Sequence, residues 1–409
     1  MGKYNSNILD LIYNKRFRSI FFQVTLLIAV TLFFVWAANN ANNNLTARGD
    51  SFGFGFLNNP AGFQILPTLG TAIIGYEAGE STYFDVFLIG IINTFIIAIT
   101  GIFATTIIGF LIGIFRLSNN IVLKGFATIY IEAFRNLPLL LHLFFWYFAV
   151  LRILPSKREK VSLLGEGFGI NITGFYGPRP IFNDGWEFVV YGLLFSIIAA
   201  IIFSNYAKRI HQQTGYQYPT FWISSSIIIF IPCVIYIIYN FLYHAPIEFQ
   251  FPEFKTDGPK LKRGYVQGVG MMMPPEMIAL WLALVLYTAA FIAEIVRAGI
   301  LAIHKGQTEA SYAVGLRRGD SLRLVIIPQA LRVIVPPLTS QYLNLTKNSS
   351  LAVAIAYPEL VSVFAGTALN QVGQEIEIIF MMAMVYLTFS LSTSLFMNWF
   401  NSRVKLVER

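Results

Sequence analysis

Long apolar stretches constrain this chain more than any other feature, because each is long enough to cross a membrane. A helix of about 20 apolar residues spans the hydrocarbon core of a bilayer. Of the 409 residues, 56% are hydrophobic and 12% are charged, which is too little charge to cover the surface of a soluble domain. The sequence therefore predicts an all-α, polytopic membrane protein with about eight transmembrane helices.

The expected spans are counted from the apolar runs and their polar borders. We expect the first run to be a retained anchor, although a signal peptide has the same order of basic and apolar residues. The run from 324 to 365 is too long for one straight helix, and we expect a single crossing broken at 336–337 and at 346–350. The expected spans are 21–38, 84–115, 122–154 with a kink at Pro138, 187–206, 220–242, 275–300, 324–365 and 376–400.

These spans divide the chain into four expected parts. Residues 1–83 hold the anchor and an exterior loop that begins at residue 39. Residues 84–155 form the first part of a core, and residues 275–409 form its second part. Residues 156–274 are an insertion with two extra spans and polar loops, in which Lys208 and Arg209 mark a cytoplasmic turn.

Basic residues set the expected orientation, because Lys and Arg collect in cytoplasmic loops. Eight spans place both termini and the basic stretch from 297 to 323 in the cytoplasm. The loop 152–186 then falls outside although it is basic. We keep the assignment, because the ends of the chain and the 297–323 stretch are stronger evidence for an even number of spans. Its charged residues are Arg152, Lys157, Arg158, Lys160 and Arg179, offset in part by Glu159, Glu166 and Asp184.

The remaining composition excludes several classes of site. The net charge of +8 follows from basic cytoplasmic loops, so we expect no nucleic-acid partner. Cys233 is the single cysteine and forms no internal disulfide. The four histidines are scattered without metal-ligand spacing, and we expect no metal or cofactor on this chain.

Residues 309–328 read EASYAVGLRRGDSLRLVIIP, a charged stretch between two apolar spans. Helix-forming residues precede Gly315, and glycine adopts the left-handed conformation that ends a helix. We expect a short helix, a tight turn and a second helix that enters the membrane, projecting as a knob with Glu309 free to pair with a basic partner. An ordinary basic cytoplasmic loop is the alternative.

This stretch resembles the EAA loop of ABC importer permeases, in which Glu-Ala-Ala is followed by Gly and by Ile-x-Leu-Pro. Here Ser311 replaces the second Ala. In that family the loop is the coupling helix, which docks in a cleft of the ATPase subunit. The resemblance implies that the coupling residues are Glu309, Ala310, Gly315 and Pro328.

Other stretches resemble the polar amino-acid permeases of the histidine/arginine/glutamine type, namely 93–118, 130–147, 286–300 and 347–355. The first span and the insertion further resemble the larger permease of general L-amino-acid importers. The resemblance implies a type I importer core in a bacterial inner membrane, surrounded by lipid. It also implies a cytoplasmic ABC ATPase dimer, a second permease that makes a heterodimer, and a periplasmic amino-acid-binding protein.

A phosphate-binding GxxxxGK[ST] loop is absent from the sequence. We therefore expect the chain not to be an enzyme, with ATP and Mg bound by the partner ATPase.

Charged residues inside spans are costly and usually functional. Glu132 with Arg135, and Glu294 with Arg297, are three residues apart on one helical face. We expect both to be structural ion pairs.

Lys347 differs, because it follows two prolines and precedes two serines at an expected helix break, where backbone groups can hold a zwitterion. A lysine that snorkels or pairs with a neighbour is the alternative. The candidate substrate path comprises Gln341, Asn344, Lys347, Asn348, Ser349 and Ser350.

Relatives that carry cationic amino acids have acidic residues at the positions of Gln341 and Asn348. Both residues here are neutral amides, so we expect no cation-selective site, and the partner permease remains the alternative holder of the substrate.

Two other classes of protein compete with this interpretation. A secondary transporter or channel for small polar solutes needs coupling-ion carboxylates inside its spans, and often an inverted repeat. The sequence has few free carboxylates and no clear repeat. A membrane scaffold has no use for a coupling knob. The sequence therefore favours the permease of an ATP-driven amino-acid importer.

Overall fold

The computed structural model describes residues 15–48, 53–159, 161–162, 167–256, 263–266 and 268–404. Lys160 and Glu166 of the basic loop lie outside these ranges, as do both ends of the chain.

Seven helical segments in the described residues are long and apolar enough to cross a membrane, and a bent pair of helices is an eighth candidate span. The predicted number of spans is therefore confirmed. The spanning elements are α2 (Lys15–Arg48), α4 (Tyr83–Arg116), α5 (Ile121–Arg135) with α6 (Leu139–Ile153), α7 (Trp186–Thr214), α8 (Thr220–Leu242), α9 (Pro275–Leu301), α11 (Arg318–Ser321) continuing through η3 (Leu322–Ile326), α12 (Ile327–Asn348) and η4 (Ser349–Ile355), and α14 (Glu375–Val404).

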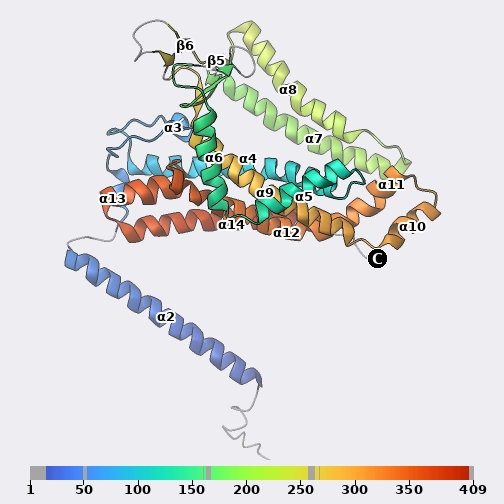
Figure 1. Cartoon of the computed structure of the whole chain (residues 1–409), viewed down its shortest axis with the longest axis horizontal. Coiled ribbons are helices and arrows are strands. Elements are labelled where there is room, and N and C mark those ends of the chain that lie inside the picture. The colour runs from blue at the N-terminus through green and yellow to red at the C-terminus, as the bar shows by residue number, and fades with distance from the viewer. Residues whose placement is uncertain are drawn as a thin grey trace, which may run out of the picture.

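Helices α4 and α9 form the centre of the fold and run parallel to each other (Figure 1). The Thr105 hydroxyl donates to the Val285 carbonyl at 3.1 Å, and eight residues later Gly113 packs against Ala293. A Cβ at Gly113 would lie 2.7 Å from the Ala293 oxygen, and a Cβ at Gly109 would lie 2.6 Å from Ile292. Glycines four residues apart thus let the two backbones approach closely, as in other membrane helix pairs.

Helix α12 crosses in the opposite direction and packs on both central helices. Its first half contacts the end of α9, where Ile334 covers Gly299, and its far end contacts the middle of α4, where Leu345 covers Gly101. Helix α14 completes the layer through contacts with α12 (Figure 1). The three helices α4, α9 and α14 are therefore parallel, and α12 is antiparallel to them.

The expected break at Pro336 and Pro337 is wrong, because α12 passes through both prolines and ends at Asn348. Both rings lie on the exposed side of α12, and the pair frees just two neighbouring backbone carbonyls. The true break comes after Asn348, in the 3₁₀ segment η4 and at Ala356, which has a φ of 56°. The π-helical η5 (Val361–Ala368) and α13 (Leu369–Val372) then continue in the direction of α12 along α4, toward the start of α4.

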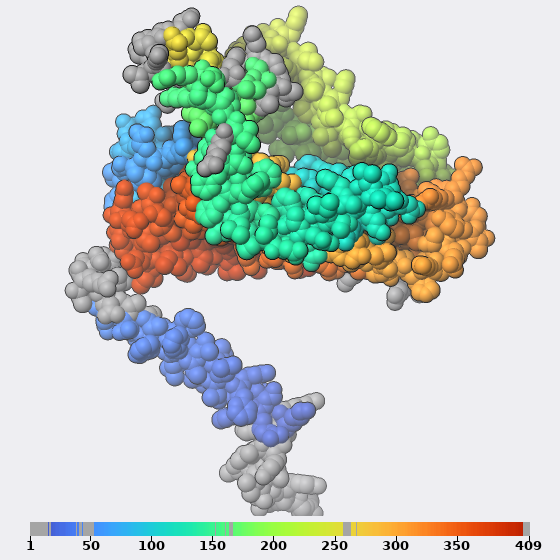
Figure 2. All heavy atoms as spheres, in the orientation of Figure 1, coloured from blue at the N-terminus to red at the C-terminus, as the bar shows by residue number. Residues whose placement is uncertain are grey.

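The third span is broken rather than kinked. Helices α5 and α6 meet at an angle of 106°, and Pro138 caps the start of α6 instead of lying inside one helix. The residue before a proline is driven out of the helical region, which ends α5 at Arg135. His142 closes the corner by stacking on Phe134, with 4.8 Å between ring centroids. Figure 2 shows α5 and α6 lying across one face of the core.

Helices α7 and α8 form a hairpin in which each helix packs mainly against the other (Figure 1). Gly192, Ser196 and Ala200 make a buried stripe of small residues on α7, and α8 packs against it. Helix α7 continues to Thr214 and ends at Gly215 in a left-handed conformation. Lys208 and Arg209 therefore lie within the helix and not in the turn that the sequence predicted.

The loops on either side of this hairpin form small antiparallel sheets that the sequence did not predict, because strands of two to four residues carry no readable alternation. The strand order is β1-β2-β3-β8, with separate pairs β4-β5 and β6-β7. The bounds are β1 (Val161–Ser162), β2 (Gly169–Asn171), β3 (Gly174–Gly177), β4 (Arg179–Phe182), β5 (Ile247–Gln250), β6 (Phe254–Lys255), β7 (Gly264–Tyr265) and β8 (Met271–Met273). The pairing puts both loops on one side of the membrane, so α7 and α8 cross as a pair.

The N-terminal part differs from the expected loop in two ways. Helix α2 extends to Arg48, so residues 39–48 are helical, and its span has no buried residue. Residues 53–82 fold over the start of α4 through η1 (Gly55–Asn58) and α3 (Leu69–Ile74). Asn93 fixes this cover, since its amide donates to Thr68 at 3.0 Å and to the Pro358 carbonyl at 2.7 Å.

Replacement of Gly113 by valine should separate α4 from α9. The new Cβ would meet a backbone oxygen that cannot turn away, and overpacking of this kind costs about 1–3 kcal/mol. We expect a lower midpoint of thermal unfolding in detergent. Gly125→Val in α5 is the matched control, because nothing lies within 4 Å of its Cβ position. Equal midpoints for the two variants would contradict the close contact.

Candidate functional site

The predicted coupling stretch lies at one end of the core, as α10 (Lys305–Ala313) followed by α11 (Figure 1). Helix α9 is 27 residues long and connects β8 at its start to α10 at its end. At about 1.5 Å per residue it spans on the order of 40 Å. The coupling stretch and the sheets therefore lie on opposite sides of the membrane.

Gly315 ends α10 in the predicted left-handed conformation, with a φ of 82°. The amide of Leu316 donates to the Ser311 carbonyl at 3.1 Å, and the amide of Gly315 donates to the Tyr312 carbonyl at 2.9 Å. These two bonds are the Schellman pattern. Nothing lies within 4 Å of a Cβ at Gly315, so the requirement for glycine is a matter of backbone conformation and not of space.

The outer face of α10 is free of contacts with the described part of the chain. Glu309 and Ala310 are exposed, and Glu309 forms no ion pair with a described residue. Val314 is 77% exposed and Tyr312 is 47% exposed, which places apolar side chains beside the carboxylate. Pro328 lies instead at the start of α12 and is half-buried.

Two contacts that the sequence did not predict hold α10 in place. The Ser311 and Ser321 hydroxyl oxygens are 2.5 Å apart, and both side chains are buried. Gln329 of α12 donates to the Gln307 amide oxygen at 3.1 Å. The sequence shows that Ser311 departs from the Ala of the EAA pattern, but it does not indicate that Ser321 is the hydrogen-bond partner.

A polar stripe lies at the far end of α12. Ser340, Asn344 and Lys347 recur at the spacing of helical turns and are exposed. Gln341 and Asn348 border them, half-buried, on a helix that stays regular between the two positions. The described residues hold no ion pair to Lys347. One helix end therefore brings together a cation and four neutral hydrogen-bonding groups.

The two serines of the expected path are placed differently. Ser349 is buried and donates to the Thr346 carbonyl at 2.7 Å, so it does not face the stripe. Ser350 donates to the Lys347 carbonyl at 2.8 Å and is half-buried.

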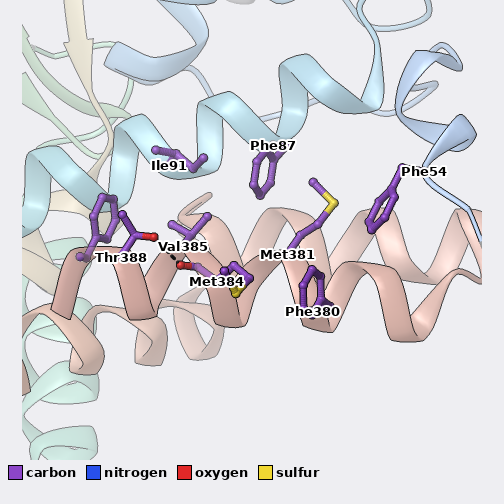
Figure 3. Close-up of a pocket in the computed structure, with 9 residues that line it drawn as sticks. Phe54, Phe87, Ile91, Phe380, Met381, Met384, Val385 and Thr388 are labelled. Atoms are coloured by element: carbon purple, nitrogen blue, oxygen red, sulfur yellow. Dashed lines mark hydrogen bonds between the residues drawn. The ribbon is translucent and has the colours of Figure 1, made fainter. Parts of the chain in front are cut away.

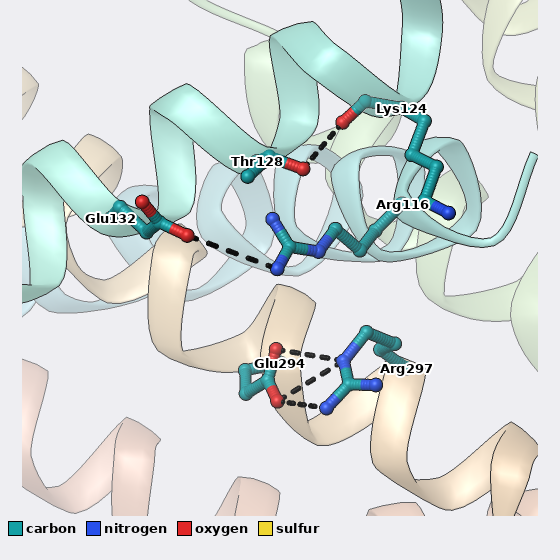
Figure 4. A network of polar contacts seen from close by, with 6 residues as sticks. All are labelled: Arg116, Lys124, Thr128, Glu132, Glu294 and Arg297. Atoms are coloured by element: carbon teal, nitrogen blue, oxygen red, sulfur yellow. Dashed lines mark hydrogen bonds and ion pairs between the residues drawn. The ribbon is translucent and has the colours of Figure 1, made fainter. Parts of the chain in front are cut away.

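The two expected ion pairs have different outcomes (Figure 4). Arg297 pairs with Glu294, its Nε lying 3.0 Å from Oε2. The expected pairing of Glu132 with Arg135 is wrong: Glu132 lies 4.0 Å from Arg116. Arg135 instead lies over the Phe291 ring, 5.3 Å from its centroid, because α5 ends there and turns the side chain toward α9.

Sequence reasoning missed the most deeply buried carboxylate among the described residues. Glu359 has no exposed surface and follows the turn after η4. It accepts hydrogen bonds from the Ser362 amide at 2.8 Å and from the Tyr386 hydroxyl at 2.9 Å. Glu359 thus ties the end of the broken crossing to α14. An acidic residue inside an apolar run was the available signal.

Two grooves on the surface have apolar linings that suit an apolar ligand and not an amino acid. One, of about 410 Å³, lies between α4 and α14 and is lined by Phe87, Met381 and similar side chains (Figure 3). Its Thr388 hydroxyl is already bonded to the Met384 carbonyl. The other, of about 640 Å³, lies between α7 and α8 and is lined by aromatic and aliphatic residues. Neither contains a charged group, so the α12 stripe is the better candidate for a polar solute.

The described residues contain no group of three or more His, Cys, Asp or Glu side chains placed to hold a metal ion.

Comparison with known proteins gives matches along almost the whole chain. The general L-amino acid transport system permease protein AapQ of Rhizobium johnstonii is 45% identical, over 97% of this chain and 94% of its own length. The putative amino-acid ABC transporter permease protein YhdX of Escherichia coli is 44% identical, over 97% and 96%. The glutamate/glutamine/aspartate/asparagine transport system permease protein BztB of Rhodobacter capsulatus is 40% identical, over 98% and 96%.

The family model described as the binding-protein-dependent transport system inner membrane component matches residues 192–406. This match covers most of the hairpin and all of α9, the coupling stretch, α12 and α14. Proteins of this family are membrane components of transporters and not the enzymes that drive them. With its helical fold and near-complete alignment to three permeases, the chain belongs to the family of binding-protein-dependent transport system inner membrane components.

Proposed function

We propose that this chain is the permease subunit of an ATP-driven amino-acid importer and couples to a separate ATPase through residues 309–328. The observation that carries the proposal is the exposed outer face of α10, with Glu309 unpaired among the described residues. The full-length relatives are named as amino-acid permeases, which supports the substrate class.

Coupling follows from the position of α10. A cleft on a cytoplasmic ABC ATPase dimer binds Glu309, Ala310 and the neighbouring apolar side chains. ATP binding, with Mg, closes that dimer and moves α10. After the turn at Gly315, α11, η3 and α12 form one continuous helical segment. The motion therefore passes to the spans as rigid-body rocking.

The α12 stripe supplies one wall of the substrate path. The Lys347 ammonium group binds the α-carboxylate of the amino acid, and the amides of Gln341, Asn344 and Asn348 bind other polar groups of the substrate. Neutral amides donate and accept, so they suit many side chains. The exposed stripe needs an opposite wall, which a second permease supplies.

The proposed partners complete the transporter. They are the ATPase dimer, a second permease that makes a heterodimer, and a periplasmic amino-acid-binding protein. The chain lies in a bacterial inner membrane with both termini and α10 in the cytoplasm, so the sheets and residues 53–82 face the periplasm.

Reconstitution tests the function directly. The complex is purified by a tag on this chain and placed in liposomes with binding protein outside and ATP inside. Uptake of radiolabelled L-glutamine and L-glutamate that stops without ATP is the expected result. Uptake that follows an ion gradient and ignores ATP would instead indicate a secondary transporter.

Charge reversal at Glu309 and loss of Gly315 should both uncouple transport. Glu309→Lys repels a basic cleft, and Gly315→Val forces a β-branched residue into a region that costs it more than about 1–2 kcal/mol. We expect normal membrane insertion with little ATP-dependent uptake. Gly319→Val is the matched control, since Gly319 is equally exposed but lacks a positive φ. Normal uptake by both variants would contradict the coupling role.

The α7–α8 turn should lie in the cytoplasm. A cysteine at Gln212, exposed near the end of α7, should resist an impermeant thiol reagent in intact spheroplasts after Cys233→Ala. A cysteine at Ala78, in the exposed turn after α3, should react. Equal labelling of the two sites would show that the orientation is wrong.

Substrate preference should follow charge at the edge of the stripe. Gln341→Glu with Asn348→Asp places two carboxylates on one face of α12, seven residues apart. In a site of low dielectric these attract arginine and lysine and repel glutamate, so the arginine-to-glutamate uptake ratio should rise on the order of tenfold. Competition for uptake measures the ratio. An unchanged ratio in a complex that still transports would place side-chain recognition in the partner or the binding protein.

A further inference from the structure

The buried side chains of the two short helices α10 and α11 are serines and not apolar residues. Ser311 is the buried residue of α10, and Ser321 is the buried residue of α11. Both are less than 4% exposed, while Glu309, Tyr312 and Val314 around them face solvent. The contact between these two short helices therefore centres on two serines.

The hydrogen bonds have one consistent direction. Ser311 Oγ lies 2.7 Å from the Thr308 carbonyl, which can accept but not donate, so Ser311 must donate there. Ser311 then has a lone pair and no further proton for the second contact. Ser321 must donate to Ser311 across the 2.5 Å between their oxygens. The chain of bonds runs from Ser321 through Ser311 to the backbone just before Glu309.

We propose that Ser311 and Ser321 are positioning residues that fix the coupling helix α10 to the base of α12. The inference rests on the proposed coupling function and assigns that function a new pair of residues. Ser321 is followed at once by the π-helical turn η3, and α10 also contacts η3. A displacement of α10 that is transmitted through this relay reaches α12 at its first turn.

The geometry also accounts for the departure from the Glu-Ala-Ala pattern at Ser311. A methyl group at this position would fill the same space but would leave the Ser321 hydroxyl buried without a partner. Buried hydroxyls that lose a partner are costly, whereas removal of both partners is nearly neutral for folding. The two serines should therefore act as a unit.

The test measures amino acid transported per ATP hydrolysed in the reconstituted complex, with L-glutamine and L-glutamate as substrates. Ser311→Ala and Ser321→Ala should each lower this ratio about fivefold, the effect expected for loss of one such bond. The double variant should be no worse than Ser311→Ala, because both hydroxyls serve one relay. ATPase co-purification and the KM for ATP should stay unchanged. Ser402→Ala is the control, since that exposed hydroxyl bonds within its own helix at the same side of the membrane.

Each outcome decides something different. A wild-type ratio in either single variant would overturn the relay, as would losses that multiply in the double variant. Lower thermal stability with an unchanged ratio would mean that the serines serve folding alone, which also overturns it. Absence of ATP-dependent uptake by the wild-type complex would overturn the proposed function itself, and with it any role of the relay in coupling.

Discussion

The close approach of α4 and α9 is the contact on which the rest of the structure depends. Lipid offers no hydrophobic driving force for helices to associate, so packing must come from surfaces that fit. Gly109 and Gly113 bring α9 near enough for side chains of one helix to touch the backbone of the other. Helix α12 then packs on both, and every polar group of the proposed path is placed relative to this pair.

The sequence was informative where one local rule acts alone. Apolar length predicted the number of crossings, and the need for a positive φ predicted the conformation of Gly315. It failed where tertiary contacts decide. The two prolines of α12 do not break the helix, since they lie on its exposed side. Arg135 does not pair with Glu132 but lies over an aromatic ring of α9.

Helix α12 connects the two parts of the proposed function. The contacts that orient α10 lie at its first turns, and the polar stripe lies at its last turns. The π-helical turn η3 stands at the first junction, and the 3₁₀ turn η4 stands at the second. Such irregular turns often mark functional positions. The sequence predicted the candidate residues at both ends, but not that an unbroken helix joins them.

The pairing of β4 with β5 brings the entry and exit of the hairpin together, with Phe182 opposite Ile247. The chain therefore leaves the core and returns to it at nearly the same point, after two crossings. An insertion that crosses the membrane an even number of times, and whose two ends lie close together, leaves the direction of every later helix unchanged. Selection can lengthen, shorten or replace such a module while α9, α10 and α12 keep their orientation, which makes this hairpin a place where related transporters are free to diverge.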